Sequence, residues 1–356
     1  MSQRPTPRRP TVALLTLGCA KNLVDSEHIA SILDRAGARV THSSEGADVA
    51  IINTCGFIEE AKQESIDLII EVGAARTAGG LRGVVVTGCL GERYGEQLRR
   101  ELPEADAVIG IDPRGAAQMA LRLAGRGTEP LPSEVALRSH RLTPRAWSYL
   151  RIAHGCENRC TYCAIPLIRG RLRSRPMDEL LAEAQELVAG GVLELNVIAQ
   201  DTANYGLDTE GKRLLHVLVR RLCRTDGLRW LRLLYMHPAH VYDELVEVMA
   251  DEEKVCPYVD VPLQHVADAV LARMGRRITR AQVEDLIARL RERLPGLALR
   301  TTFMTGFPGE TDRDFAELLD FVRQMRFDRL GCFVYSREEG TPAAELPDQV
   351  PRRVAE

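Results

Sequence analysis

The sequence has no long apolar run. Nowhere in its 356 residues is there an uninterrupted stretch of the ~18 apolar residues that a membrane span needs. The first residues, Met1 to Thr11, are rich in Pro and Arg and lack the apolar core of a secretory signal. We therefore expect no contact with membranes and a cytoplasmic protein.

The chain also has little net charge. Its 47 basic and 50 acidic residues give a formal charge of −3, so no global electrostatic footprint for nucleic acid is present. Nine cysteines without a secretory signal indicate a reducing compartment, where thiols serve metals or redox chemistry and not disulfides. The length is sufficient for two domains.

Three cysteines lie on one short loop. Cys156, Cys160 and Cys163 are separated by three and then two residues. Iron–sulfur clusters are held by cysteine thiolates, normally four for a four-iron cube. Three ligands leave one iron open, and an open metal position is where chemistry occurs. Zinc is an alternative, but zinc ligands usually come as two close pairs, and no second pair follows. Three unrelated buried thiols are the other alternative.

Residues 10–125 alternate between short β-branched runs and helical patterns. Asp25 or Ser26 is a plausible N-cap of the first helix, and Gly37 a plausible stop. Such alternation predicts a doubly wound parallel α/β sheet in an N-terminal domain. The expected strands cover residues 12–17, 49–53 and 83–86.

A cysteine follows each of these strands: Cys19, Cys55 and Cys89, roughly 35 residues or one βαβ unit apart. Ligands of such sheets bind outside the carboxyl ends of the strands. Any single thiol is more often an inert small hydrophobe, but three in the same topological position predict a second three-thiolate cluster. The remaining thiols have no mutual spacing and are expected in the core: Cys223, Cys256 and Cys332.

Residues 126–146 lack periodicity and predict a linker. A second alternation then fills residues 147–356 with six β/α units, which are too few to close an eight-stranded barrel, so we expect a partial (β/α)6 barrel. The first of its strands delivers the Cys156 loop to the carboxyl-end face, where barrel active sites lie. Strands are expected at 149–153, 193–198, 228–234, 258–261, 298–304 and 330–334, and helices at 177–189, 241–250, 279–294 and 311–325.

The spacing of the loop cysteines, with the aromatic Tyr162 before the last, resembles the signature of the radical S-adenosylmethionine (SAM) enzymes. Two open clusters on two α/β domains resemble the methylthiotransferases. Within these, the chain resembles the RimO family from residue 14 to about 345, and it differs from the tRNA-modifying branch at residues 20–22 and after Cys55. The stretches that carry the resemblance are 16–27, 53–58 and 258–265.

This resemblance implies that the enzyme adds a methylthio group to the β carbon of an aspartate in the small-subunit ribosomal protein of the decoding centre. The cofactors would be two 4Fe–4S clusters and SAM, with an electron donor such as flavodoxin or ferredoxin. The cluster at Cys156, Cys160 and Cys163 would cleave SAM to methionine and a 5′-deoxyadenosyl radical. The other cluster would present a sulfur that a second SAM methylates. No tRNA is expected as a substrate.

Several side chains then become candidate SAM contacts. Tyr162 could pack on the adenine or simply pack its loop. Gln200 and Asp201 could hold the amino group. Gly306 could allow SAM to approach the backbone closely. Glu310 could either contact SAM or cap the next helix. The alternate arginines at 169, 171, 173 and 175 would lie on one side of an extended segment, as a solvated loop or as carboxylate contacts.

The rival interpretations are a tRNA adenosine methylthiotransferase, a cobalamin-dependent radical SAM protein and an iron–sulfur carrier. No Asp-x-His motif occurs, which speaks against cobalamin. A carrier would not need a six-unit barrel with polar strand ends. Members of the RimO family usually continue into a C-terminal β-barrel, the TRAM domain, which we expect to be absent from this chain.

Overall fold

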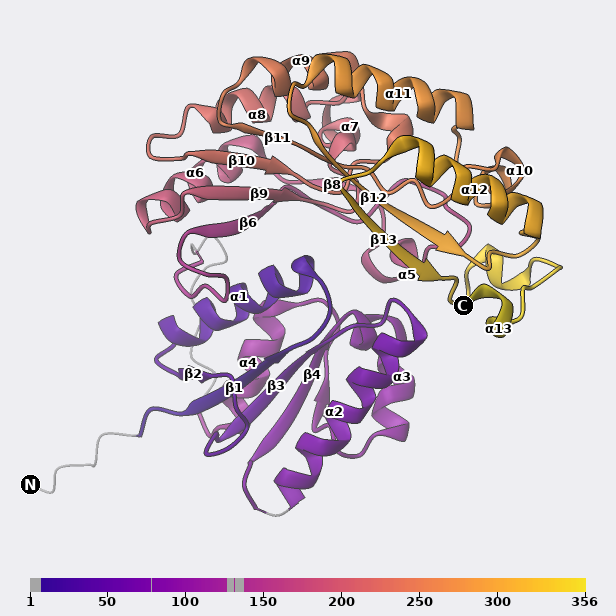
Figure 1. Cartoon of the computed structure of the whole chain (residues 1–356). Coiled ribbons are helices and arrows are strands. Elements are labelled where there is room, and N and C mark those ends of the chain that lie inside the picture. Colours follow the sequence, from indigo (N-terminus) through magenta and orange to yellow (C-terminus); the bar gives the residue numbers. More distant parts are fainter. Residues whose placement is uncertain (1–7, 78, 127–130, 132–137) are drawn as a thin grey trace, which may run out of the picture. The chain divides into compact units, whose positions relative to one another are not determined.

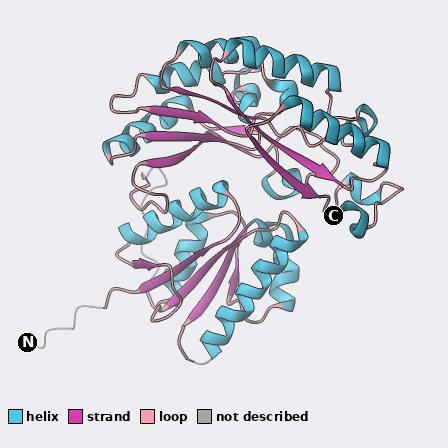
Figure 2. Cartoon of the chain, viewed as in Figure 1, coloured by secondary structure: helices cyan, strands magenta, loops and turns pink. Residues whose placement is uncertain are grey.

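A computed structural model describes residues 8–77, 79–126, 131 and 138–356. The chain divides into two units, Met1–Leu142 and Thr143–Glu356, each with strands at its centre and helices outside (Figures 1 and 2). The predicted linker at 126–146 falls partly outside the described residues. The domain limits 10–125 and 147–356 therefore stay predictions.

The first unit contains a parallel five-stranded sheet in the order β2-β1-β3-β4-β5. This is the order of a doubly wound sheet, as the alternation predicted. Two strands were missed because they are only two or three residues long. The strands are β1 Thr11–Thr16, β2 Arg39–Thr41, β3 Val49–Thr54, β4 Gly83–Gly88 and β5 Ala107–Val108, and the helices are α1 Ala20–Arg35, α2 Glu59–Thr77, α3 Cys89–Glu101 and α4 Pro113–Leu123.

Both faces of this sheet are covered. Because successive side chains of a strand point to opposite faces, Val12 and Leu14 pack with α1 and α4, whereas Ala13 packs with α2 and α3 on the other side. Each fully buried aliphatic side chain contributes about 1.5–3 kcal/mol. The sheet is therefore a rigid platform for the loops at its carboxyl edge.

Helix α1 begins earlier than its sequence indicates. Its N-cap is Cys19, so Asp25 and Ser26 lie inside the helix and are buried. The prediction of an N-cap there was wrong because Ser26 has a different partner, the hydroxyl of Thr16 at 2.7 Å. The predicted stop is confirmed: Gly37 follows the helix with a φ of 77°.

The second unit is built on a six-stranded sheet in the order β13-β12-β11-β10-β9-β6, in which every pair is parallel. The partial (β/α)6 barrel is thus confirmed. Figure 1 shows helices α9, α11 and α12 along one side of this curved sheet. The strands are β6 Trp147–Arg151, β9 Glu194–Ile198, β10 Trp230–Leu233, β11 Val255–Asp260, β12 Ala298–Thr305 and β13 Arg329–Val334.

Helices α11 and α12 begin at capping boxes, at Thr279 with Gln282 and at Thr311 with Asp314. A small antiparallel pair, β7 Ala153–His154 with β8 Arg173–Ser174, closes the base of the cysteine loop. No described helix combines the length and the apolar character that crossing a membrane requires. The helices of this unit are α5 Ile165–Arg169, α6 Met177–Ala189, α7 Leu207–Glu210, α8 Leu215–Cys223, α9 Asp243–Asp251, α10 Asp268–Arg273, α11 Arg280–Arg293, α12 Asp312–Met325 and α13 Arg352–Ala355.

Two expectations about the core and surface were only partly right. Cys223 and Cys256 are buried, but Cys332 is exposed, because β13 is the last strand of its sheet. The arginines at 169–175 do not share a side, because the segment folds into α5, a turn at Gly170 and β8 instead of one extended strand. Arg169 is buried, whereas Arg171 is exposed and pairs with Glu157.

Candidate metal centres

The first cysteine triplet lies at the carboxyl edge of the N-terminal sheet. Strand β1 leads to Cys19, β3 to Cys55 and β4 to Cys89. Strand β1 lies between β2 and β3, so the strand order reverses between β1 and β3. Sheets of this order bind ligands at that switch point, and two of the three thiols flank it.

Close backbone contacts bring the three cysteines of this unit together. A Cβ on Gly18, the neighbour of Cys19, would lie 3.0 Å from the Cβ and 3.3 Å from the Sγ of Cys55. A Cβ on Gly56, the neighbour of Cys55, would lie 2.9 Å from the carbonyl carbon of Cys89. Both glycines are therefore needed for the approach of the three loops.

Asn22 of α1 ties these loops to one another. Its buried amide group donates hydrogen bonds to the backbone oxygens of Leu17 and Thr54, at 3.1 and 2.8 Å. Its Oδ1 accepts from the thiol of Cys89 at 3.4 Å. No local pattern marks Asn22 for this role, because its partners are 5, 32 and 67 residues away.

Two of these thiols sit at helix N-termini. Cys19 is the N-cap of α1, and Cys89 is the first residue of α3. Exposed N–H groups and the helix dipole at this end favour negative charge. The thiolate is the form that binds iron, so the placement suits metal ligands.

The second triplet lies on the loop that follows β7 in the barrel unit. The backbone N–H of Asn158 donates to the Sγ of Cys156 at 3.4 Å, and the N–H of Cys163 donates to the carbonyl oxygen of Cys160 at 3.1 Å. Burial, with a smaller contribution from the neighbouring thiols, raises the pKa of Cys156 and of Cys163 to about 12 each. The three sulfurs are thus close enough to repel one another as anions, and a bound cation would offset that repulsion.

Among the described residues, no three His, Cys, Asp or Glu side chains converge closely enough to share a single metal ion. In a four-iron cube each ligand binds a different iron, so the ligands of a cube need not converge on one point.

A buried carboxylate holds the second cysteine loop in place. Asp201, 3% exposed, follows β9, and its Oδ2 accepts from Asn158 of the loop at 2.9 Å, from Asn204 at 3.0 Å and from His240 Nδ1 at 2.6 Å. Its Oδ1 accepts from the backbone N–H of His237 at 3.2 Å. Burial alone would raise the pKa of Asp201, but the bond from His240 and the other donors outweigh it and lower the pKa.

His237 and His240 stack with ring centroids 4.5 Å apart. Burial, followed by the positive charge of Arg276, lowers the pKa of His237 to about 3. This ring is therefore neutral near pH 7, so the stack does not place two cations together.

Tyr162 packs inside the barrel unit. Its hydroxyl accepts a hydrogen bond from Arg276 Nη1 at 3.0 Å, and its ring meets Phe307 edge to face at 6.4 Å. Burial raises its pKa above the usual value. These contacts match the loop-packing alternative, and contact with an adenine stays a prediction.

Gln200 carries an unsatisfied acceptor. Its Oε1 is buried and has no hydrogen-bond partner among the described residues. Orphaned buried acceptors are rare, and this one lies at the carboxyl end of β9, beside Asp201. An ammonium group of a bound ligand would satisfy it, so the site fits the predicted SAM contact.

The loop after β12 contains the two remaining candidates. Glu310 does not cap the next helix, because Thr311 occupies the N-cap of α12. Instead the Glu310 Oε2 accepts from the backbone N–H of Phe307 at 3.0 Å and closes its own turn. A Cβ on Gly306 would lie 2.2 Å from the Cβ of Ala355, so the C-terminal helix α13 covers this glycine. Their contacts with SAM stay predictions.

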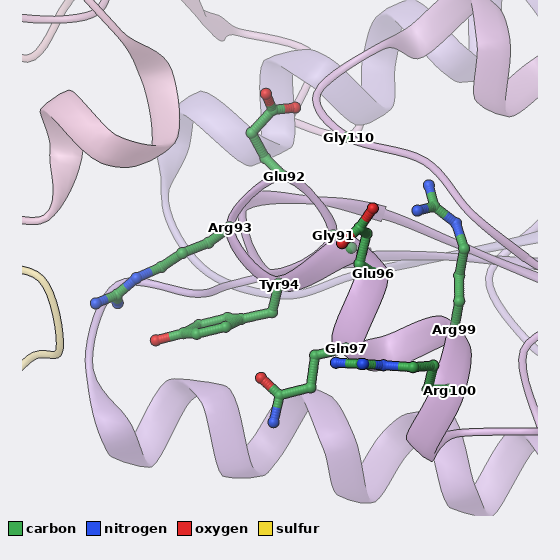
Figure 3. A pocket seen from close by; sticks show the side chains of 10 residues that line it. Gly91, Glu92, Arg93, Tyr94, Glu96, Gln97, Arg99, Arg100 and Gly110 are labelled. Carbon is green, nitrogen blue, oxygen red and sulfur yellow. The ribbon is translucent and has the colours of Figure 1, made fainter.

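A surface hollow of about 550 Å³ is lined by residues of α3 and by Gly110, and its lining includes no cysteine. Figure 3 shows that Glu92, Arg93, Arg99 and Arg100 point in different directions around it. Several of these side chains are used by the protein itself: Arg93 binds the carbonyl of Gly56, and Glu92 accepts from a backbone N–H. The hollow is lined by both acidic and basic side chains, so its charge does not indicate a particular class of ligand.

Comparison with known proteins identifies the family. The family model described as "Radical SAM superfamily" matches residues 150–322, and that of "Uncharacterized protein family UPF0004" matches residues 11–110. The ribosomal protein uS12 methylthiotransferase RimO of Geotalea uraniireducens is 50% identical over 351 residues, which are 96% of this chain and 78% of that protein. The RimO protein of Lachnoclostridium phytofermentans is 45% identical over 350 residues, covering 96% and 80%. The chain belongs to the RimO family.

RimO family membership makes the chain a radical SAM methylthiotransferase with SAM and two 4Fe–4S clusters as cofactors. Solved structures agree in fold. The radical SAM methyltransferase TsrM of Kitasatospora setae, solved with cobalamin and a 4Fe–4S cluster, has a TM-score of 0.67 at 17% identity and covers 94% of this chain and 77% of its own. The cobalamin-dependent enzyme OxsB has a TM-score of 0.60 at 15% identity, covering 88% and 52%. At such identities the likeness shows the fold alone.

Proposed function

We propose that this chain adds a methylthio group to the β carbon of an aspartate in ribosomal protein uS12, with one cluster on each cysteine triplet. The observation that carries the proposal is the presence of two separate triplets, each at the carboxyl edge of its own parallel sheet. Neither triplet has a fourth cysteine beside it in the sequence. Each would therefore leave one iron open.

The target C–H bond is too inert for acid–base chemistry, so cofactors must supply the reactivity. When bound, the barrel cluster gives SAM the electron that generates a carbon radical, and the N-terminal cluster supplies the sulfur. Cys156, Cys160 and Cys163 would hold the former, and Cys19, Cys55 and Cys89 the latter. The donor set fits, because thiolates are the ligands of iron–sulfur clusters.

The other residues of the barrel site bind SAM or hold the cysteine loop in position. Gln200 presents its free Oε1 to the amino group of SAM, and Asp201 fixes the loop through Asn158. Tyr162 keeps its loop packed against Phe307. Gly306 and Glu310 shape the turn after β12.

The partners follow from the chemistry. A ribosomal protein is the substrate, and a low-potential protein such as flavodoxin or ferredoxin supplies the electron. Clusters of this kind require thiols that stay reduced, so the cytoplasm is the proposed compartment. The small net charge of −3 favours a protein substrate over tRNA, whose binding depends strongly on neutralised phosphates.

The test is mass spectrometry of two substrates under one set of anaerobic conditions. A peptide with the aspartate loop of uS12 should gain about 46 Da, the mass of one methylthio group replacing hydrogen, while bulk tRNA gains nothing. The matched control is the Cys160→Ala variant, which should leave the peptide unmodified. Methylthioadenosine in digested tRNA, with the peptide unchanged, would assign the chain to the tRNA branch instead.

A further inference from the structure

Arg276 is a buried cation that forms no ion pair with a described carboxylate. It follows α10 after a two-residue turn and is only 6% exposed. Its Nη1 donates to the Tyr162 hydroxyl at 3.0 Å, its Nη2 donates to the Pro262 carbonyl at 2.6 Å, and its Nε is buried without a partner. In the part of the chain that the structure describes, no carboxylate forms an ion pair with this guanidinium; the charge of the buried Asp201 acts on it, after the larger effects of Tyr162 and Cys160. Such a charge is costly to bury unless something compensates for it.

The backbone places this charge next to Cys160. On one side of that cysteine, the N–H of Thr161 donates to the carbonyl of Met274 at 2.9 Å. On the other side, the Arg159 carbonyl oxygen would lie 2.7 Å from a Cβ on Gly275, whose φ of 68° also favours glycine. Both neighbours of Cys160 therefore rest on the turn that leads directly into Arg276.

The field of the guanidinium reaches the thiols. It acts on Cys160, and it lowers the pKa of Cys163 against the larger effect of burial. The hydroxyl that it binds belongs to Tyr162, the residue between these two cysteines. The guanidinium of Arg276 is thus held in a fixed position beside the loop and is not a mobile, solvated group.

A four-iron core with three thiolates carries net negative charge, and one-electron reduction makes it more negative. The reduction potential of such a cluster depends on charge, hydrogen bonds to sulfur and solvent exposure. We propose that Arg276 is the counter-charge of the cluster on Cys156, Cys160 and Cys163, and that it raises the reduction potential of that cluster. This role rests on the cluster assignment proposed above. It makes Arg276 a positioning and tuning residue that need not touch SAM.

The experiment uses the full chain with Cys19, Cys55 and Cys89 changed to Ala, so that one cluster remains. After anaerobic reconstitution, iron is counted and the midpoint potential is measured by dithionite titration followed by electron paramagnetic resonance. In the Arg276→Gln variant, the reduced-to-oxidised ratio at a fixed potential should fall on the order of tenfold, about 59 mV for one electron. Arg276→Lys should keep most of the wild-type potential.

Arg277 provides the matched control. It is the adjacent residue, carries the same charge and is exposed, so water and salt screen it. Arg277→Gln should leave the potential unchanged. Equal potentials in wild type, Arg276→Gln and Arg277→Gln, each with about four irons, would overturn the proposal.

The iron count separates this proposal from the cluster assignment. If the unsubstituted Arg276 protein binds no iron at the remaining triplet, the assignment fails. If Arg276→Gln alone fails to bind iron, the lysine variant decides. A lysine variant that holds iron near the wild-type potential supports a role of the charge, and loss of iron there too assigns Arg276 to packing and overturns the proposal.

Discussion

Replacing Asp201 with Asn should loosen the cysteine loop of the barrel even without any ligand. The carboxylate accepts hydrogen bonds from Asn158, Asn204, His240 and the backbone of His237. An amide of the same shape keeps one oxygen but turns two N–H groups toward these donors. The carboxylate's negative charge, which strengthens the four bonds, is also lost.

The expected magnitude follows from burial. Breaking a buried charged network costs roughly 3–5 kcal/mol. Because Asn retains one acceptor, we expect the lower end, about 3 kcal/mol, from Asp201→Asn. The barrel unit spans Thr143–Glu356, and domains of that size lose roughly 2–4 °C of melting temperature per kcal/mol. The metal-free variant should therefore melt roughly 6–12 °C lower.

Asp208→Asn is the matched control for this measurement. Asp208 is exposed and accepts two hydrogen bonds from Ser174, at 2.6 and 2.8 Å. Its replacement should cost only about 1 kcal/mol. Melting is followed by circular dichroism on metal-free protein, and iron binding is then counted on each variant. If both variants melt at the same temperature and bind the same iron, Asp201 does not hold the loop.

Two further predictions concern the metal centres. A Cys19→Ala, Cys55→Ala, Cys89→Ala triple variant should retain half of about eight irons after reconstitution, and full retention would remove the N-terminal cluster. Cys160→Ala should abolish 5′-deoxyadenosine formation, because SAM loses its iron, whereas Cys55→Ala should keep that cleavage and stop methylthio transfer to the peptide. A folded Cys55→Ala protein that loses both activities would contradict this division.

The sequence predicted where the cysteines lie because their position depends on local patterns. Short β-branched runs mark strands, and a cysteine directly after a strand must lie at its carboxyl edge. The same rule located both sheets and the loop that starts at Cys156. The start of α1 was predicted wrongly, because its N-cap is Cys19 and not one of the usual N-cap residues Ser, Thr, Asp or Asn. Cys19 makes no side-chain cap hydrogen bond.

The environments of the arginines at 169–175 and of Cys332 were harder to predict. The alternation of arginines at 169–175 suggested an extended segment, but Gly170 has a φ of 68° and interrupts it. Cys332 has the apolar neighbours of a core residue, yet it is exposed because no further strand follows β13 in the sheet. The deciding factor was a glycine within the segment in the first case and the edge position of the strand in the second.

The supporting roles of Asp201 and Arg276 could not have been predicted for a related reason. Asp201 meets Asn158 across 43 positions, and Arg276 meets Tyr162 across 114. A ligand cysteine is recognised by its own chemistry and spacing, whereas a residue that tunes the ligand acts only through a partner. That partner is set by the register of β9 and by the turn after α10. A substitution at Asp201 or Arg276 therefore tests the tertiary structure directly, since neither residue belongs to a sequence motif that would already predict the result.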